Sequence, residues 1–163
     1  MTQAEKLLKE YLDYLEIEKN RSVKTRENYE RYLKYFFTQT KINQISDLNL
    51  EKVKNFRLHL ARTDLKKVTQ NYYVIAIRNF LKYLNKKDLA SLSPDKIELP
   101  KIPQRQIELI EYSDLERLLA TPQTNNLRGL RDKAILELLF STGLRLSELC
   151  HLNRYLDLKR GEM

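Results

Sequence analysis

The side chains in this sequence with the clearest potential for chemistry are its lysines and arginines. The 163 residues contain 30 Lys and Arg against 22 Asp and Glu, a formal net charge of +8. Residues 21–100 alone hold 17 basic and 8 acidic side chains, whereas residues 101–163 hold 10 and 9. Such a basic block favours a polyanionic partner, because neutralisation of phosphates drives nucleic-acid affinity. The same charge also suits a solvated surface that only keeps a protein soluble, so charge alone leaves both interpretations open.

The rare residue types exclude several other chemistries. A single cysteine, Cys150, rules out an internal disulfide framework and a multi-cysteine zinc site, and two histidines argue against a His-rich metal site. We therefore expect neither a metal nor a cofactor. No apolar run approaches the ~18–20 residues of a membrane span, and residues 1–10 are too charged for a secretory signal. The sequence predicts a cytoplasmic protein without a membrane partner.

Hydrophobic spacing predicts that helices position the basic side chains. Three glycines and four prolines are too few for a turn-dense β sandwich or barrel. We predict four amphipathic helices in the first hundred residues, opened by Thr2 with Glu5 in a capping box, by Ser22, by Asn49 and by Thr69. Their apolar stripes are Ala4, Leu7, Leu8, Tyr11, Leu12 and Leu15; Tyr29, Leu33, Phe36 and Phe37; Val53, Phe56 and Leu60; and Tyr73, Ile77, Phe80, Leu81 and Leu84.

A proline-bearing segment separates these helices from the rest of the chain. Residues 91–103 hold three of the four prolines, which predicts an extended linker. Three further helices are expected: one opened by Ser113 with Glu116, one over about Leu130–Ser141 that ends at Gly143, and one over about Arg145–Leu152. Residues 157–162 predict the edge of a strand that enters a turn.

The sequence Thr-Gly-Leu-Arg-Leu-Ser-Glu-Leu at 142–149 closely resembles the arginine box of the tyrosine recombinase (phage integrase) family, particularly its Xer-type bacterial members. The resemblance extends from Leu130 through Leu152 to the turn at 160–162, and helices two and four resemble helices of the family's core-binding domain. It implies a chain that is all-α as present. A four-helix, SAM-like core-binding domain would occupy residues 1–92, a linker 93–106, and the opening helices of a truncated mixed α/β catalytic domain 107–163.

The resemblance implies a catalytic role for Arg145 and a supporting role for Glu148. In the full-length family, DNA strands are cleaved and rejoined through a phosphotyrosine intermediate. A planar, permanently charged guanidinium can bind two non-bridging phosphate oxygens at once. Glu148 lies three residues on, where it can orient the arginine through an ion pair. Without the surrounding motif, a solvated or ion-paired helix arginine would be the simpler interpretation of Arg145.

The family's other catalytic residues are not found after this box. The family needs a lysine, a His-x-x-Arg pair, a His or Trp and a nucleophilic tyrosine downstream, and 14 residues follow Leu149. His59 with Arg62 precedes the box, His151 with Arg154 follows it too closely, and Tyr155 comes too early in the domain. We therefore expect an N-terminal fragment that does not cleave DNA alone.

The resemblance also directs the second and fourth helices toward the DNA major groove. Lysines and arginines would mostly hold phosphates, and the amides of Gln70 and Asn71 have the geometry to pair with adenine. Thr69 is equally well explained as a helix cap, and Tyr72 as a cover for the core. The candidate DNA-binding residues are Arg21, Lys24, Thr25, Arg26, Arg31, Lys66, Lys67, Thr69, Gln70, Asn71, Tyr72, Arg78 and Lys82.

Three functions remain open at this point. The first is the DNA-binding part of a site-specific recombinase for DNA integration or chromosome-dimer resolution, with double-stranded DNA as partner. In the full-length family, the recombinase protomers assemble as a tetramer on two DNA sites. The second is a truncated, non-enzymatic DNA-binding protein that occupies or regulates recombination sites. The third is a helical adaptor whose basic face binds acidic proteins.

Overall fold

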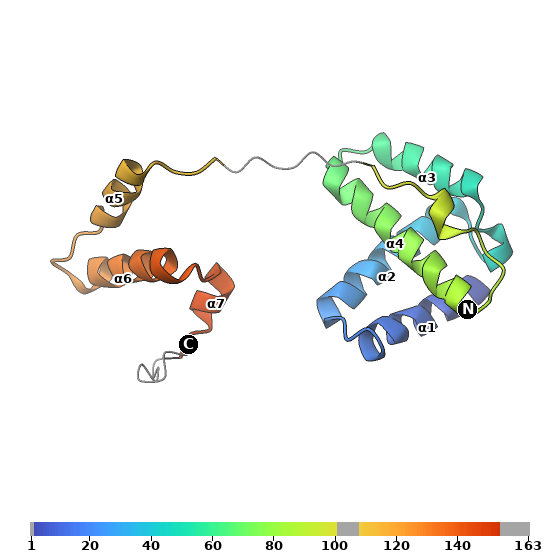
Figure 1. Ribbon diagram of the computed structural model, residues 1–163, viewed down its shortest axis with the longest axis horizontal. Helices are drawn as coiled ribbons and strands as arrows, with labels where there is room; N and C mark the ends of the chain where they lie inside the picture. Colours follow the sequence, from blue (N-terminus) through green and yellow to red (C-terminus); the bar gives the residue numbers. More distant parts are fainter. Residues whose placement is uncertain (1, 101–107, 154–163) are drawn as a thin grey trace. The chain divides into compact units, whose positions relative to one another are not determined.

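The computed structural model describes residues 2–100 and 108–153. The chain divides into two compact units, residues 1–104 and 105–163, which are described separately (Figure 1). Every regular element in the described ranges is a helix, as the spacing of apolar residues predicts. None of these helices combines the length and the apolar character needed to cross a bilayer.

The first unit is built around its longest helix, α4. Its helices, in chain order, are α1 (Gln3–Ile17), α2 (Val23–Thr40), the short 3-10 helix η1 (Ile45–Asp47), α3 (Leu50–Ala61), α4 (Lys67–Lys86) and the 3-10 helix η2 (Pro94–Lys96). Helix α4 contacts α1, α2, α3 and η2, and Figure 1 shows it running between α2 and α3. Helix α4 thus contacts every other α-helix of the unit, while α1 also packs extensively against α2.

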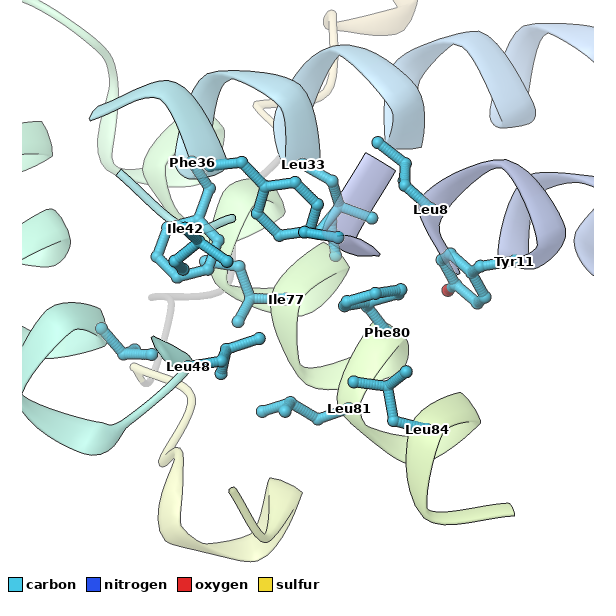
Figure 2. Close-up of a cluster of buried hydrophobic side chains, with 14 of the residues drawn as sticks. Leu8, Tyr11, Leu33, Phe36, Ile42, Leu48, Ile77, Phe80, Leu81 and Leu84 are labelled. Carbon is cyan, nitrogen blue, oxygen red and sulfur yellow. The ribbon is translucent and has the colours of Figure 1, made fainter. Parts of the chain in front are cut away.

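The buried core of the first unit consists mainly of the predicted apolar stripes. Leu33, Phe36 and Phe80 are inaccessible to solvent, and Figure 2 shows them packed together between α2 and α4. Of the predicted stripe residues, Leu7, Tyr29 and Tyr73 are only partly buried. The core also contains buried residues outside the predicted stripes: Ile42, Ile45, Leu48, Val74, Ala76, Tyr83 and Ile97. Several of these lie in connecting segments, where no periodic pattern marks them.

Three of the four predicted helix starts in the first unit are confirmed. Thr2 and Glu5 form the capping box, with the Thr2 N–H donating to Glu5 at 2.8 Å and the Glu5 N–H to the Thr2 hydroxyl at 3.2 Å. Ser22 and Asn49 accept backbone N–H bonds at the starts of α2 and α3. The Thr69 cap is wrong: α4 begins at Lys67, so Thr69 lies within its first turn.

The first residues of the predicted linker pack against the first unit instead of extending away from it. Pro94 opens η2 and is buried, and Ile97 is only 2% exposed within the core. Arg57 also donates a hydrogen bond from Nη1 to the Glu98 carbonyl at 3.2 Å. Proline is well suited to the first position of such a helix, because its missing N–H would have no partner there. Pro94 therefore starts a short helix, whereas the sequence predicted an extended chain here.

The second unit contains α5 (Tyr112–Ala120), α6 (Leu127–Thr142) and α7 (Leu146–Cys150) in its described part. Asn126 caps α6 by accepting the Gly129 N–H at 2.8 Å. Ser113 does not cap α5, because that helix begins one residue earlier, after Glu111. The predicted ending of α6 is confirmed, since Gly143 takes the left-handed conformation at φ +67°. The predicted strand edge at 157–162 lies outside the described residues.

Removal of the Phe80 ring tests the central role of α4. Phe80→Ala should lower the free energy of unfolding of the first unit by about 3–5 kcal/mol, because it removes a fully buried ring and leaves a cavity. Urea unfolding followed by far-UV circular dichroism measures this loss. Leu58→Ala is the matched control, because the Leu58 side chain is mostly exposed on α3. A loss below about 1 kcal/mol for Phe80→Ala would contradict this packing.

Candidate nucleic-acid interface and arginine site

The turn between α1 and α2 carries the first group of candidate residues. Asn20 adopts a left-handed conformation at φ +46°, which asparagine tolerates better than most residues. The Arg21 N–H donates to the Leu15 carbonyl at 2.9 Å, so the turn folds back on the end of α1. Arg21 is exposed on this turn, and Lys24 is exposed in the first turn of α2, where it pairs with Glu27 at 3.3 Å. Two of the predicted basic residues are thus fixed by backbone geometry at the start of α2.

A groove of about 630 Å³ lies between this turn and the C-terminal half of α4. We call it the tyrosine groove; its lining residues are Tyr11, Tyr14, Leu15, Lys19, Arg21, Thr25, Tyr29, Asn79, Lys82, Tyr83 and Lys86. It brings Arg21 and Thr25 together with Lys82, although these candidates were predicted on different helices. Sequence reasoning missed Lys19 and Lys86, because only the packing of α1 against α4 places them at the same groove.

The cations around the tyrosine groove are mostly free of acidic partners. Lys86 pairs with Glu18 at 3.5 Å and lies 4.9 Å from the centre of the Tyr14 ring. No carboxylate of the described residues lies within 4.0 Å of the charged groups of Lys19, Arg21 or Lys82. No acidic side chain lines the groove itself. The groove is therefore a concentrated patch of unneutralised positive charge.

The start of α4 presents a second group of candidates, with one exception. Lys66 and Lys67 are exposed, and Tyr72 is 50% exposed. Gln70 is half-buried, and its amide donates to the Leu65 carbonyl at 2.8 Å. Asn71 differs from these residues, because it is only 6% exposed and lies three residues before the buried Val74.

Arg26 is a structural ion-pair residue and does not form part of an open basic surface. Its guanidinium lies 3.1 Å from Glu16, 3.7 Å from Glu30 and 4.0 Å from Asp13, and the side chain is only 28% exposed. Three carboxylates neutralise its charge and link α1 to α2. The predicted phosphate contact by Arg26 is therefore not supported. The position of Glu30 four residues after Arg26 indicates their pairing from the sequence alone. The pairing with Asp13 and Glu16 depends on the packing of α1 against α2.

Arg31 and Arg78 both contact other side chains of the first unit, but only Arg78 forms an ion pair with another described residue. Arg31 is exposed, donates to the Asn28 side chain at 3.0 Å and lies 5.2 Å from the centre of the Tyr32 ring. Arg78 is half-buried and pairs with Asp95 of η2 at 3.5 Å. Arg31 thus keeps an accessible charge on α2, whereas Arg78 is directed toward η2.

In the second unit, Arg145 is the N-cap residue of α7. The preceding turn is built by Gly143 in its left-handed conformation and by the Thr142 hydroxyl, which accepts the Leu144 N–H at 3.3 Å. The Arg145 side chain is 82% exposed, so its guanidinium is accessible for binding an anion. The turn therefore places a permanent positive charge at the start of a short helix.

Glu148 forms hydrogen bonds with both the backbone and the side chain of Arg145. The Arg145 N–H donates to Glu148 Oε2 at 2.7 Å, and Nη1 donates to Oε1 at 3.1 Å. These two bonds, the backbone bond first, lower the pKa of Glu148 below its ordinary value. The ion pair expected from the i, i+3 spacing is therefore present. It orients the guanidinium while leaving its other N–H groups free.

Each histidine has a hydrogen-bonding partner within its own unit. His59 lies in the first unit, where its Nε2 is 2.9 Å from the Tyr35 hydroxyl. His151 Nδ1 lies 2.6 Å from the Ser147 carbonyl within α7, and Arg154 lies outside the described residues. In residues 2–100 and 108–153, no group of three or more His, Cys, Asp and Glu side chains could hold a metal ion.

Two family models match this chain in the expected order. The model described as "Phage integrase, N-terminal SAM-like domain" matches residues 8–88, which include most of α1 and all of α2, α3 and α4. The model described as "Phage integrase family" matches residues 108–163, which include Arg145 and Glu148. The two matched ranges together cover most of the chain.

The chain is also similar to named recombinases along nearly its whole length. It is 31% identical to tyrosine recombinase XerC of Escherichia coli O1:K1 / APEC over 168 residues, which cover 100% of this chain and 56% of the relative. It is 30% identical to XerC of Bacillus subtilis (92% and 51%) and 30% identical to XerD of Staphylococcus aureus Mu50 (91% and 52%). The chain thus spans about half the length of these relatives.

A solved structure agrees with the fold. The crystal structure of XerA recombinase matches 97% of this chain and 53% of its own, with a TM-score of 0.50 and 22% identity. At that identity the likeness concerns the fold alone. With matching models for both units and about 30% identity along the chain, this protein belongs to the phage integrase family of tyrosine recombinases.

Proposed function

We propose that this chain binds duplex DNA through its first unit, as the DNA-binding part of a site-specific tyrosine recombinase. The observation that carries the proposal is the meeting of Arg21, Thr25 and Lys82 at one groove whose cations have few acidic partners. A concentrated, unneutralised positive surface attracts the phosphate backbone and releases its counterions on binding.

Phosphate contacts would come from exposed basic residues at the turn between α1 and α2, at the start of α2, and at the start and along the length of α4. These are Arg21, Lys24, Lys66, Lys67 and Lys82. Arg31, the hydroxyls of Tyr72, Thr25 and Thr69, and the side chain of Gln70 complete the proposed surface. Asn71 and Arg26 are left out, because the first is buried and the second is neutralised. Such contacts fix the register of a protein on DNA without reading its sequence.

Arg145 would serve the chemical step in a complete catalytic domain. Strand cleavage builds up negative charge on the non-bridging oxygens of the phosphate, and a guanidinium stabilises that charge best when it is already oriented. The two bonds from Arg145 to Glu148 supply this orientation. In the whole protein, strand cleavage and rejoining through a phosphotyrosine would serve chromosome-dimer resolution or DNA integration. We further propose cytoplasmic action by recombinase protomers that assemble as a tetramer on two DNA sites.

Salt dependence tests the electrostatic part of the proposal. If five phosphates are neutralised, the logarithm of the binding constant should fall against log[salt] with a slope of about −4.5. Fluorescence anisotropy of a labelled duplex between about 50 and 200 mM salt measures this slope. Lys82→Ala should make it shallower by about 0.9. Lys54→Ala is the matched control, because Lys54 is exposed on α3 away from the groove. A binding constant independent of salt would contradict the proposal.

A second experiment separates DNA binding from the arginine site. Arg145→Ala should weaken duplex binding by the 163-residue chain no more than loss of one phosphate contact does, because the first unit supplies the main surface. The same variant should raise the pKa of Glu148 toward its ordinary value, since the guanidinium bond is lost, as measured by carboxyl-carbon NMR.

The sign of the Glu148 effect follows from its lowered pKa. The ionised carboxylate stabilises the start of α7 above the pKa of the unfolded chain, and this stabilisation is lost as pH falls through the folded pKa. An unchanged Glu148 pKa in Arg145→Ala would contradict the ion pair. Loss of duplex binding in Arg145→Ala, or nicking of DNA by the unmutated chain, would show that the second unit does more than proposed.

A further inference from the structure

Tyr11 carries a buried hydroxyl that the fold leaves without a partner. The residue is 1% exposed, and its ring packs against Phe80 at 5.4 Å and Tyr83 at 5.1 Å between centroids. No group in the part of the chain that the structure describes forms a hydrogen bond with its oxygen. A phenylalanine would pack equally well without leaving a buried polar group unsatisfied. A hydrogen-bond partner for this hydroxyl would therefore have to come from outside the protein.

Tyr11 lies beside a groove that is rich in hydrogen-bond donors. Tyr11 lines the tyrosine groove together with Arg21 and Lys82. Tyr29 contributes a hydroxyl that accepts the Asn79 amide at 2.9 Å and so keeps its own proton for donation. Burial raises the pKa of Tyr11, so its hydroxyl stays protonated and can only donate to an anion. Lysine and arginine donors in a lining without a carboxylate match a ligand that offers acceptor oxygens.

We propose that the tyrosine groove is a phosphate pocket, in which a phosphoryl group accepts a hydrogen bond from Tyr11 and is neutralised by Arg21 and Lys82. A volume of about 630 Å³ is within the range of small-molecule sites, so the pocket can hold the sugar or base attached to the phosphate. The phosphoryl group can be a phosphodiester of DNA or the phosphate of a free nucleotide. Only the DNA source depends on the proposed function.

The test uses the whole 163-residue chain with three probes at constant ionic strength: inorganic phosphate, adenosine 5′-monophosphate and a short DNA duplex. Because the chain has ten tyrosines and no tryptophan, incorporation of 3-fluorotyrosine allows ¹⁹F NMR of each ring, and Tyr11→Phe assigns the Tyr11 signal. We expect that signal to shift saturably with at least one probe. Tyr11→Phe and Arg21→Ala should each weaken binding of that probe about tenfold or more.

Matched controls separate the pocket from general effects. Tyr73→Phe removes a hydroxyl whose ring packs against Tyr32 outside the groove, and Lys54→Ala removes a cation from α3. Both controls should bind like the unmutated chain. Tyr11→Phe should unfold at the same or a higher temperature without ligand, because it removes only the unsatisfied hydroxyl. A lower unfolding temperature would show that the hydroxyl already has a partner and would overturn the proposal.

The three probes also distinguish this proposal from the proposed function. Salt-sensitive duplex binding that Tyr11→Phe and Arg21→Ala leave unchanged, with no response to phosphate or nucleotide, would overturn the pocket and leave DNA binding standing. Tyr11-dependent binding of the nucleotide without duplex binding would support the pocket and contradict the proposed function. Competition between nucleotide and duplex, lost in Tyr11→Phe, would support the pocket with both sources of phosphate.

Discussion

The burial of one face of α4 is the constraint on which the first unit depends. Phe80, Leu81 and Leu84 on this face are inaccessible to solvent, and the helix contacts α1, α2, α3 and η2. A helix with one face fixed in a core has its other face fixed as well, because side-chain direction follows from the 3.6-residue period. Tyr72 and Lys82 therefore stay exposed, and the packing that excludes water from the core also sets the geometry of the basic surface.

Local signals in the sequence were sufficient for the features that depend on a few neighbouring residues. The caps at Thr2, Ser22 and Asn49 and the end of α6 at Gly143 each involve bonds within four residues. Other features depend on distant elements, which no local pattern reveals. Asn71 is buried because its position on α4 faces the core, and Arg26 is neutralised partly by carboxylates from α1. Pro94 and Ile97 pack against a core that the linker pattern does not reveal.

The arginine site was predictable for the same reason, because its geometry is almost entirely local. Gly143 turns the chain, Thr142 bonds to the Leu144 N–H, and Glu148 bonds to both the backbone and the side chain of Arg145. None of these contacts needs a residue more than three positions away. The exposure of Leu130, Phe140 and Leu146 shows how little tertiary packing surrounds this segment in the described residues. The motif thus encodes its own conformation.

The distribution of acidic residues, more than the number of basic ones, gives the first unit an asymmetric charge. Glu30 lies beside both Arg26 and Lys34, and Glu10 pairs with Lys87, so these cations are neutralised within the fold. The lining of the tyrosine groove contains no carboxylate. Exposed ion pairs add little to stability, but each one removes a charge from the long-range field of the protein. Arg21 and Lys82 at this groove have no carboxylate partner among the described residues, and this local imbalance of charge underlies the proposed binding of phosphates.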